Sequence, residues 1–203
     1  MSLAGPPPAF ERDGYTIVAG LIDPAMTALL VAHSEALLAR GELKLGDRAV
    51  PGTPFAYGDP LLDRVLEQLR PRIETEVGRR LLPTFSYLRL YKTGDVLKRH
   101  RDRPACEVTA SLNLSQTPAE PWPLHLIGRT GPRAAVLQPG DALIYLGCEL
   151  PHWRTAFEGE RLAQVFLHYV DADGPHAVEQ FDRREALGVK PKPGTGKKRQ
   201  LRP

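Results

Sequence analysis

Two residues with the chemistry of metal ligands stand two positions apart near the middle of the chain. His100 and Asp102 occur in the segment YKTGDVLKRHRD, where an alternating apolar run is ending. Side chains at i and i+2 of a strand point to the same side, so an imidazole and a carboxylate can reach one point. A durable site needs a third ligand, and the candidate is His152 in GCELPHWRTAF, 50 residues after Asp102. The alternative is that His100 and Asp102 are solvated residues of a turn.

Two helices are predicted ahead of these ligands. Asp23 and Asp59 are each followed by proline, which is typical of an N-cap and a first helical position. Pro71 is expected to kink or divide the second helix. The apolar faces of the two helices are Met26, Leu30, His33 and Leu37, ending at Gly41, and Leu62, Val65, Leu66, Leu69 and Ile73. This spacing makes His33 a residue of the core edge and not a ligand.

The segments around the first helix are less regular. FERDGYTIVAGLI is predicted to be a short strand that enters the helix, because Gly14 breaks the chain before a β-branched run. Residues 41–58 hold four Gly and two Pro, which predicts a loop or lid over a site.

From Thr84 onward the apolar period changes from about 3.6 to about 2. The short runs, separated by Gly, Pro and Asp, are TFSYLRLY, VLKRHRD, EVTASLNLS, WPLHLI, AAVLQ, DALIYL, HWRTAF and RLAQVFLHYV. Seven or eight short strands after two helices predict a mainly β fold, a jelly roll or barrel backed by helices. The prediction is a single domain over residues 1–182, with helical support over 1–83 and the jelly-roll core over 84–171.

Composition places the protein among soluble globular chains. Of 203 residues, 42% are hydrophobic and 25% charged, and no apolar run is long enough to span a membrane. The N-terminus MSLAGPPPAF lacks the pattern of a signal peptide, which indicates a cytoplasmic protein. Cys106 and Cys148 are accordingly expected to be free thiols.

The positive charge is concentrated at the C-terminus. Residues 183–203 carry eight Lys or Arg and one acidic residue, a net charge of +7, while the preceding 182 residues carry 19 basic and 23 acidic residues, a net charge of −4. The tail is rich in Pro, Gly and Lys and has little to bury, so it is predicted to be flexible. It is either a solvating extension or a contact for nucleic acid or another acidic partner.

Three segments together resemble the Fe(II)- and 2-oxoglutarate-dependent dioxygenases, in particular their prolyl-hydroxylase-like branch. They are YKTGDVLKRHRD, LQPGDALIYLGCELPHW and FEGERLAQVFLHYV, within residues 84–171. Two His and one carboxylate on one face of a metal leave other positions open, as non-heme Fe(II) oxygenases require. The resemblance implies a double-stranded β-helix of the cupin-like type, and Fe(II), 2-oxoglutarate and O2 as cofactor and co-substrates.

The resemblance also implies roles for further residues. Arg161, nine residues after His152, would pair with the distal carboxylate of 2-oxoglutarate, because a buried carboxylate needs a planar, permanently charged partner. The alternative for Arg161 is a structural ion pair with Glu158 or Glu160. Tyr91 and Asn113 are the other expected co-substrate contacts, although Tyr91 is equally suited to the core.

Several residues near the ligands are candidates for lining the pocket and reading the substrate, against the alternative of ordinary packing at the rim. They are Arg103, Glu107, Ser111 and Trp153, with Thr109 on the same face of its strand as Ser111. His168 faces opposite to Arg161 along its strand and is therefore excluded from the predicted site.

The leading hypothesis is a hydroxylase that acts on an unactivated C–H bond of a small molecule, amino acid or peptide side chain and releases succinate and CO2. The presence of Asp102 speaks against halogenation, since halogenating relatives replace this carboxylate with a small residue. One alternative is a cupin-like metal-binding module without turnover. Another is an oxygenase guided to nucleic acid by the basic tail, which is weaker because Arg161 is the only arginine after His152 in GERLAQVFLHYV.

Overall fold

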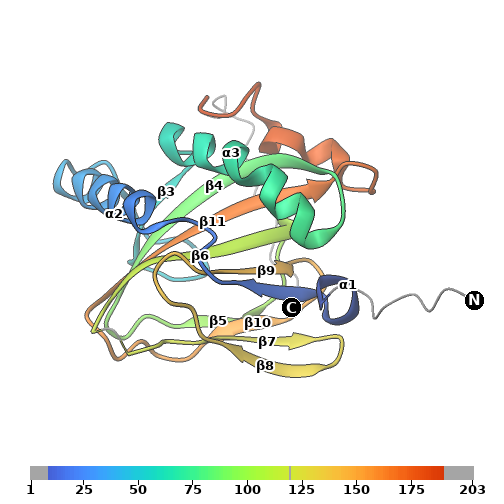
Figure 1. The fold of residues 1–203 in the computed structure, drawn as a ribbon. Helices are drawn as coiled ribbons and strands as arrows, with labels where there is room; N and C mark the ends of the chain where they lie inside the picture. The colour runs from blue at the N-terminus through green and yellow to red at the C-terminus, as the bar shows by residue number, and fades with distance from the viewer. Residues whose placement is uncertain (1–8, 119, 190–203) are drawn as a thin grey trace, which may run out of the picture.

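Two antiparallel sheets face each other in the computed structural model, which describes residues 9–118 and 120–189 (Figure 1). The large sheet has the order β1 (Tyr15–Val18), β9 (Ala142–Leu146), β6 (Val108–Thr117), β11 (Arg161–Asp171), β4 (Leu81–Lys92), β3 (Pro54–Tyr57) and β2 (Lys44–Leu45). The small sheet has the order β5 (Leu97–His100), β10 (His152–Arg154), β7 (Leu124–Gly128) and β8 (Gly131–Ala135). The predicted mainly β, jelly-roll fold with flanking helices is confirmed.

The helices begin where the sequence predicted. Helix α2 (Pro24–Ala39) is capped by Asp23, whose side chain accepts a hydrogen bond from the Met26 N–H at 2.8 Å. Helix α3 (Pro60–Val77) is capped in the same way by Asp59 and ends at a left-handed glycine, Gly78. His33 lies at the edge of the core, 2.9 Å from Asp59, as expected. The remaining helices are α1 (Ala9–Asp13) and the short 3-10 segments η1 (Pro104–Cys106) and η2 (Ala177–Arg183).

Two local expectations were wrong, and a third was wrong in part. Of the kink or division expected at Pro71, the division does not occur: α3 runs from Pro60 to Val77 with Pro71 exposed inside it, so the hydrogen bond that Pro71 lacks faces solvent. Residues 9–13 form a helical turn ahead of strand β1, where only a strand was expected. Residues 54–57 of the predicted loop form strand β3, which pairs with β4. The glycines and prolines on both sides of its two aromatic residues had indicated a loop instead.

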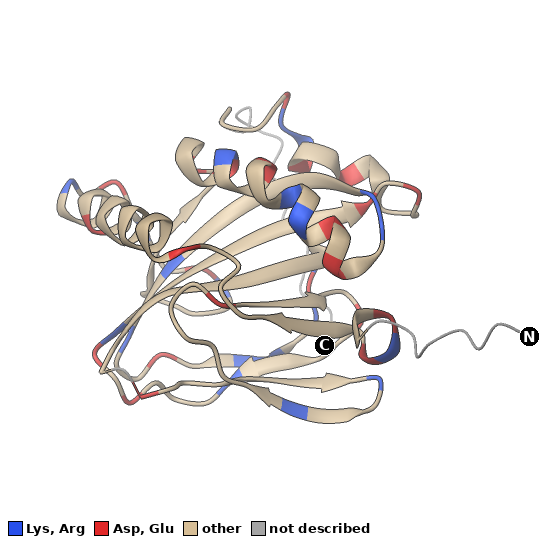
Figure 2. Ribbon diagram, viewed as in Figure 1, with Lys and Arg blue, Asp and Glu red and all other residues tan. Residues whose placement is uncertain are grey.

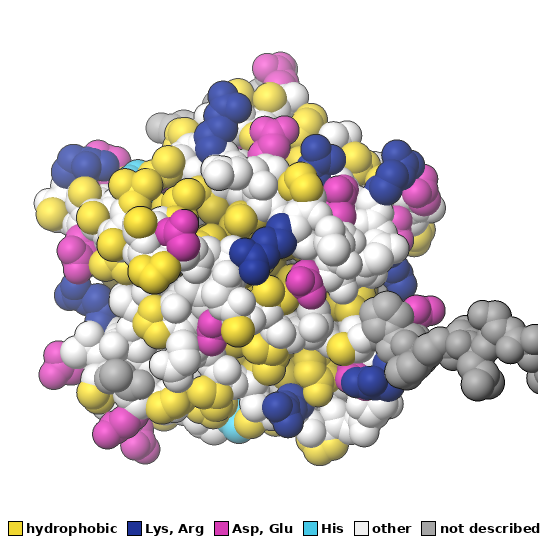
Figure 3. Space-filling view, viewed as in Figure 1, with side chains coloured by type: hydrophobic (Ala, Val, Ile, Leu, Met, Phe, Trp, Pro, Cys, Tyr) yellow, Lys and Arg dark blue, Asp and Glu magenta, His cyan; other side chains and the backbone are white. Residues whose placement is uncertain are grey.

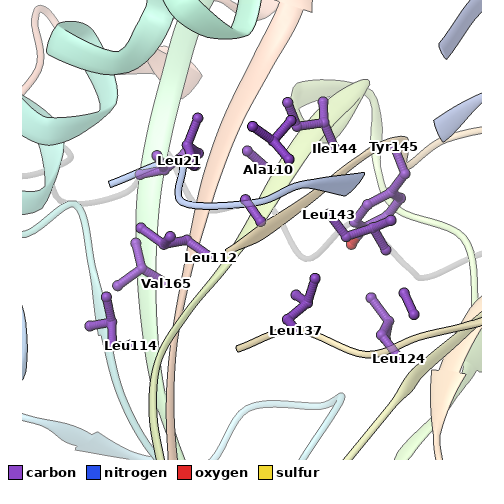
Figure 4. Packing of buried hydrophobic residues seen from close by; sticks show 14 of the residues in the cluster. Leu21, Ala110, Leu112, Leu114, Leu124, Leu137, Leu143, Ile144, Tyr145 and Val165 are labelled. Atoms are coloured by element: carbon purple, nitrogen blue, oxygen red, sulfur yellow. The ribbon is translucent and has the colours of Figure 1, made fainter. Parts of the chain in front are cut away.

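The core lies in two layers around the large sheet. Figure 1 shows α2 and α3 above this sheet and the small sheet below it. Tyr169 of β11 faces α3, where its hydroxyl donates to the Leu66 carbonyl at 2.7 Å. On the other side, Leu143 and Tyr145 of β9 lie toward Leu124 of the small sheet (Figure 4). Alternate side chains of β11 thus face the helices on one side of the large sheet and the small sheet on the other.

Charged residues lie mainly on the helices and connecting segments, while the central strands of the large sheet carry few of them (Figure 2). Figure 3 shows hydrophobic side chains gathered over α2, where Leu29 is 54% exposed. No helix in residues 9–118 and 120–189 has both the length and the apolar character needed to cross a bilayer. Cys106 and Cys148 are free thiols.

The C-terminal part of the folded body extends further than expected. The predicted flexible tail began at Arg183, but Arg184 is buried and pairs with Asp63, and Leu187 packs against the core. Residues 183–189 therefore belong to the body of the domain. Residues 190–203, which hold most of the basic tail, lie outside the described residues.

Candidate active site

The three predicted metal ligands meet inside the barrel. The Nε2 atoms of His100 and His152 lie 3.4 and 3.6 Å from Oδ1 of Asp102. One ligand atom from each of the three residues falls within 4.8 Å of the others, a spacing that can hold one metal ion. His152 is buried, and the other two are partly buried.

Strand pairing brings these ligands together. His152 lies opposite His100 on β5 and opposite Leu126 on β7. The register between β10 and β5 then shifts, so that Arg154 pairs with Leu97. This irregularity lets both Leu97 and His100, three residues apart, face the interior. An uninterrupted ladder would turn one of the two outward.

Both histidines are oriented by their own backbone. Nδ1 of His100 lies 2.8 Å from the Lys98 carbonyl, and Nδ1 of His152 lies 2.9 Å from the Leu150 carbonyl. A carbonyl only accepts, so each Nδ1 carries a proton. The Nε2 that faces Asp102 donates to the carboxylate when the imidazole is protonated, and it offers its lone pair to a metal ion when the imidazole is neutral. Burial lowers the pKa of His152, which favours the neutral imidazole that metals require. The chemistry of this donor set fits a divalent metal ion.

Asp102 is held in its ionised form. Burial acts to raise its pKa, but the charge of His152 and the hydrogen bond from His100 outweigh it and lower the pKa to about 2. The Asp102 N–H donates to the Gly147 carbonyl at 2.9 Å, and the Thr109 hydroxyl lies 3.4 Å from Oδ2. Gly147 leaves the room for this carboxylate, since a Cβ there would lie 2.5 Å from Oδ2.

The ligands open onto a cavity of about 230 Å³ between the two sheets. Its wall is largely aromatic on the side of the large sheet and carries two arginines, Arg89 and Arg103. The other lining residues are Asp47, Ala49, Tyr57, Phe85, Tyr87, Tyr91, Leu97, Cys106, Leu124, Tyr145, Phe166 and His168.

Arg154, two residues after His152 on β10, is a buried cation of a different kind. Its side chain donates to the Trp122 carbonyl and, at 3.3 Å, to Oε1 of Gln164, and its guanidinium lies 4.5 Å from the centre of the Trp122 ring. Among residues 9–118 and 120–189 it forms no ion pair with a carboxylate. Burial lowers its pKa. A guanidinium buried in this way favours the arrival of an anion.

Two further polar atoms at this end of the barrel lack a partner within the described chain. They are Nε1 of Trp122, whose ring contacts Arg154 and Tyr91, and Oδ1 of Asn113, which lies opposite Gln164 in the ladder. Native structures leave few such atoms without a hydrogen bond. The Arg154 guanidinium and the Trp122 N–H are donors that an anionic group could use, whereas the Asn113 oxygen is an acceptor and would need a donor.

The three predicted co-substrate residues have different locations. Tyr91 is buried and lines the cavity, with its hydroxyl 3.4 Å from Arg89 Nη1. Asn113 is buried behind the wall, where its amide donates to the Leu137 carbonyl at 2.9 Å. Arg161 was expected to be buried, and this is wrong: it is the first residue of β11, at the solvent-exposed end of the strand. Its row does contain the buried Ala163 and Val165, but that row faces the helices.

Of the predicted substrate residues, Arg103 alone lines the cavity. The Glu107 carboxylate accepts from the Asp171 N–H at 2.9 Å, and the Ser111 hydroxyl accepts from Gln164 Nε2 at 2.9 Å. Both side chains therefore bind to residues of β11 and stabilise the large sheet. Trp153 lies on the outer face of β10, stacked on His125 at 5.5 Å, because neighbouring residues of a strand point to opposite sides.

His168 was excluded from the site, and the structure corrects this. It lines the cavity, its Nδ1 lies 3.0 Å from the Thr109 hydroxyl, and its ring packs 4.4 Å from Phe85. The exclusion followed from assigning Arg161 to the inner face, and the two residues do lie on opposite faces. Burial lowers the pKa of His168 to about 4.

Sequence reasoning also missed Arg154 and the carboxylates of Asp47 and Asp182. Arg154 had a usable signal, because it stands at i+2 from His152 as Asp102 does from His100. Asp47 and Asp182 reach the site from distant segments, with no local pattern to indicate it.

Comparisons with known proteins agree on the fold. No protein-family model matches the chain, and no curated protein matches it. Among solved structures it is similar to a prolyl-4-hydroxylase from Pseudomonas putida (20% identity, TM-score 0.64, covering 79% of this chain and 95% of that one). It is also similar to SnoN, a non-heme alpha-ketoglutarate-dependent epimerase from nogalamycin biosynthesis (20%, TM-score 0.70, 90% and 89%). A third is HygX from Streptomyces hygroscopicus with nickel, 2-oxoglutarate and hygromycin B bound (15%, TM-score 0.63, 81% and 85%). The chain therefore has the fold of the Fe(II)/2-oxoglutarate oxygenases.

Proposed function

We propose that this protein is an Fe(II)- and 2-oxoglutarate-dependent oxygenase that hydroxylates a small molecule. The observation that carries the proposal is the combination of two backbone-oriented imidazoles, one ionised carboxylate and, two residues after His152 on β10, a buried guanidinium that has no carboxylate partner among the described residues. The fold neighbours named above include enzymes described as dependent on alpha ketoglutarate, and one bound to nickel and 2-oxoglutarate.

His100, Asp102 and His152 would hold the iron, and Arg154 would pair with the distal carboxylate of 2-oxoglutarate. Fe(II), with 2-oxoglutarate and O2, would supply the oxidation of an unactivated C–H bond, giving succinate and CO2 as by-products. The role first assigned to Arg161 passes to Arg154, because a planar donor fork that is excluded from water gives a carboxylate its strongest partner. Arg89, which lines the cavity, is less suited than Arg154, since Asp47 already neutralises it.

The chain's own residues perform the remaining tasks. Tyr91 and Trp122 flank Arg154 and shield its guanidinium from water. Thr109 links Asp102 to His168 and fixes the position of the carboxylate. The aromatic wall of Phe85, Tyr87 and Phe166 gives the substrate an apolar surface next to the ligands. Exclusion of water strengthens each of these polar contacts.

An anaerobic titration tests the proposal. Fe(II) and 2-oxoglutarate are added to the purified protein, and the weak visible charge-transfer band of the chelated pair is followed. We expect the band only with both components, and a weaker band at equal 2-oxoglutarate in Arg154→Met than in wild type or Arg161→Gln. Iron binding without the band would favour the cupin-like metal-binding module instead.

A further inference from the structure

The mouth of the cavity is built from two clusters of the same composition. In the first, the Asp47 carboxylate accepts from the Tyr87 hydroxyl at 2.5 Å and pairs with Arg89. In the second, the Asp182 carboxylate accepts from the Tyr57 hydroxyl at 2.5 Å and from both terminal nitrogens of Arg103 at 2.6 Å. Each arginine at the mouth thus already has its own anion.

The two carboxylates come from segments outside the barrel, and each is fixed in place. Oδ1 of Asp47 accepts from the N–H groups of Ala49 and Val50, which ties it to its own loop. Asp182 stands between Phe181 and Arg183, and all three have positive φ (58°, 49° and 65°). Such backbone is strained for residues other than glycine and persists only where the surroundings impose it. Arg184, anchored to Asp63, supplies that constraint.

Between the clusters lies a continuous aromatic surface. Tyr57 stacks on Phe85 at 4.9 Å, and Tyr87 stacks on Phe55 at 5.2 Å and meets Phe166 edge-on at 6.4 Å. The arginines cover part of it: Arg103 lies 4.7 Å from the Phe85 ring centre and Arg89 lies 5.2 Å from that of Tyr87. Planar rings with paired charges at the border suit an apolar or aromatic ring.

We propose that this mouth is a charge-neutral aromatic subsite that selects an uncharged, ring-bearing substrate. Asp47 and Asp182 are the residues that determine this specificity, because they keep Arg89 and Arg103 neutralised. The assignment of the bound molecule as a substrate rests on the function proposed above, whereas the binding preference does not.

The preference follows from the partners already present. An anionic ligand would have to displace a carboxylate that the chain holds in place by several hydrogen bonds. A cationic ligand would have to compete with an arginine for the same carboxylate. A neutral ring leaves both clusters intact and is stabilised by burial of its apolar surface.

Matched probes that differ only in charge test the proposal. They are 3-phenylpropanamide, 3-phenylpropanoate and 3-phenylpropylamine, with binding measured by calorimetry on protein loaded with Ni(II) and 2-oxoglutarate, and on metal-free protein. Wild type should bind the amide about tenfold more tightly than either ion, a difference of one ion-pair contact. A preference for a charged probe, or no binding of any probe, would overturn the proposal.

Removing an aspartate and removing an arginine from a cluster should change the charge preference in opposite directions. Asp182→Asn and Asp47→Asn each free an arginine, so 3-phenylpropanoate should gain about tenfold in affinity; Arg103→Gln should favour the ammonium probe instead. Asp173→Asn, which removes an exposed pair with Arg80 away from the cavity, is the matched control and should leave the order unchanged. Because the two aspartates lie on separate segments, misfolding of one variant, checked by thermal melting, leaves the other decisive. An unchanged order in the folded cluster variants contradicts the proposal.

The result is independent of the oxygenase assignment. If the charge-transfer band with Fe(II) and 2-oxoglutarate is absent but the amide preference appears in metal-free protein, the proposed function fails and the neutral subsite stands. If the band is present but the amide is not bound more tightly than the two ions, the proposed function is supported and the neutral subsite is refuted.

Discussion

Arg184 donates to Asp63 at 2.6 Å across 121 residues of sequence, and both side chains are almost completely excluded from solvent. Asp63 also accepts from the Ser86 N–H and hydroxyl and from the Gly188 N–H. Every lone pair of the carboxylate is therefore used. This network fastens the C-terminal segment to α3 and β4 and fixes the turn that holds Asp182 at the mouth.

Asp63→Ala should lower the free energy of unfolding by about 3 to 5 kcal/mol, because it leaves the buried Arg184 charge without its carboxylate, with only the Phe181 and Thr84 carbonyls as partners. Urea unfolding followed by circular dichroism measures this. The double variant Asp63→Leu with Arg184→Met should recover part of the loss, since no charge is then buried. Asp173→Asn should cost less than about 1 kcal/mol, because its pair with Arg80 is exposed. Equal losses in Asp63→Ala and Asp173→Asn would show that the buried pair contributes little.

Arg154→Met should weaken 2-oxoglutarate binding by about 10- to 100-fold, the worth of a charge-assisted hydrogen bond. The metal-free protein should lose less than about 1 kcal/mol of stability, because burial of the unpaired guanidinium already opposes folding. Calorimetric titration of 2-oxoglutarate into the Ni(II) protein and urea unfolding give the two numbers. Arg161→Gln serves as the control and should bind like wild type. If Arg161→Gln binds 2-oxoglutarate more weakly than Arg154→Met does, Arg161 is the residue that pairs with the co-substrate.

His152→Ala should abolish metal binding while the fold persists, since the barrel core does not depend on the ion. His125→Ala is the matched control, because His125 stacks on Trp153 on the outer face of the same sheet. Equilibrium dialysis against Ni(II) measures the stoichiometry, with circular dichroism as the check on folding. One equivalent of tightly bound metal in His152→Ala would remove this residue from the ligand set.

Gly147→Ala should weaken metal binding because the new methyl group would press against the Asp102 carboxylate as well as against the Cys106 carbonyl. Gly128→Ala provides a comparable clash, with Tyr15 at 2.6 Å, away from the ligands. Both variants should lose stability, but Gly128→Ala should keep its Ni(II) affinity. Equal Ni(II) affinity in the two variants would mean that Asp102 has room to move.

Stability should fall as the pH is lowered from about 6.5 to 4, in part through His168. Its pKa is about 4 in the folded protein and 6.5 in the reference state, so below pH 6.5 the unfolded chain takes up a proton that the folded chain does not. The effect is absent above pH 6.5 and reaches at most about 3 kcal/mol near pH 4. Urea unfolding from pH 7.5 to 4.5 should show a smaller fall in His168→Gln. Parallel curves would refute the assignment to His168.

The two long helices and most strands were predictable because each depends on local rules. Asp followed by Pro identified the starts of α2 and α3, and alternation identified β4, β6 and β11. The close spacing of His100 and Asp102 indicated that they could reach one point, although β5 ends at His100 and Asp102 lies just beyond it. That His152 meets them depends on the pairing of β10 with β5.

Arg161 shows where local rules stop. Alternation correctly places Arg161 and His168 on opposite faces of β11, because the register shifts with β6 and β4 add their extra residue to the partner strand and not to β11. Alternation does not say which of the two faces covers the metal ligands, because that depends on how the sheets pack, which a single sequence does not reveal. The carboxylates of Asp47 and Asp182 are harder still, because their arginines lie 42 and 79 residues away.

The pairing of His152 with His100 has a mechanical consequence. Strand β5 is an edge of the small sheet, and it is joined to β10 by a short ladder. Edge strands are the places where sheets open or recruit a second chain. In the function proposed above, an ion bound by both His100 and His152 would cross-link this ladder and close a loop of about 50 residues without a covalent bond. The supply of metal would then govern the stability of this edge of the barrel as well as the reaction.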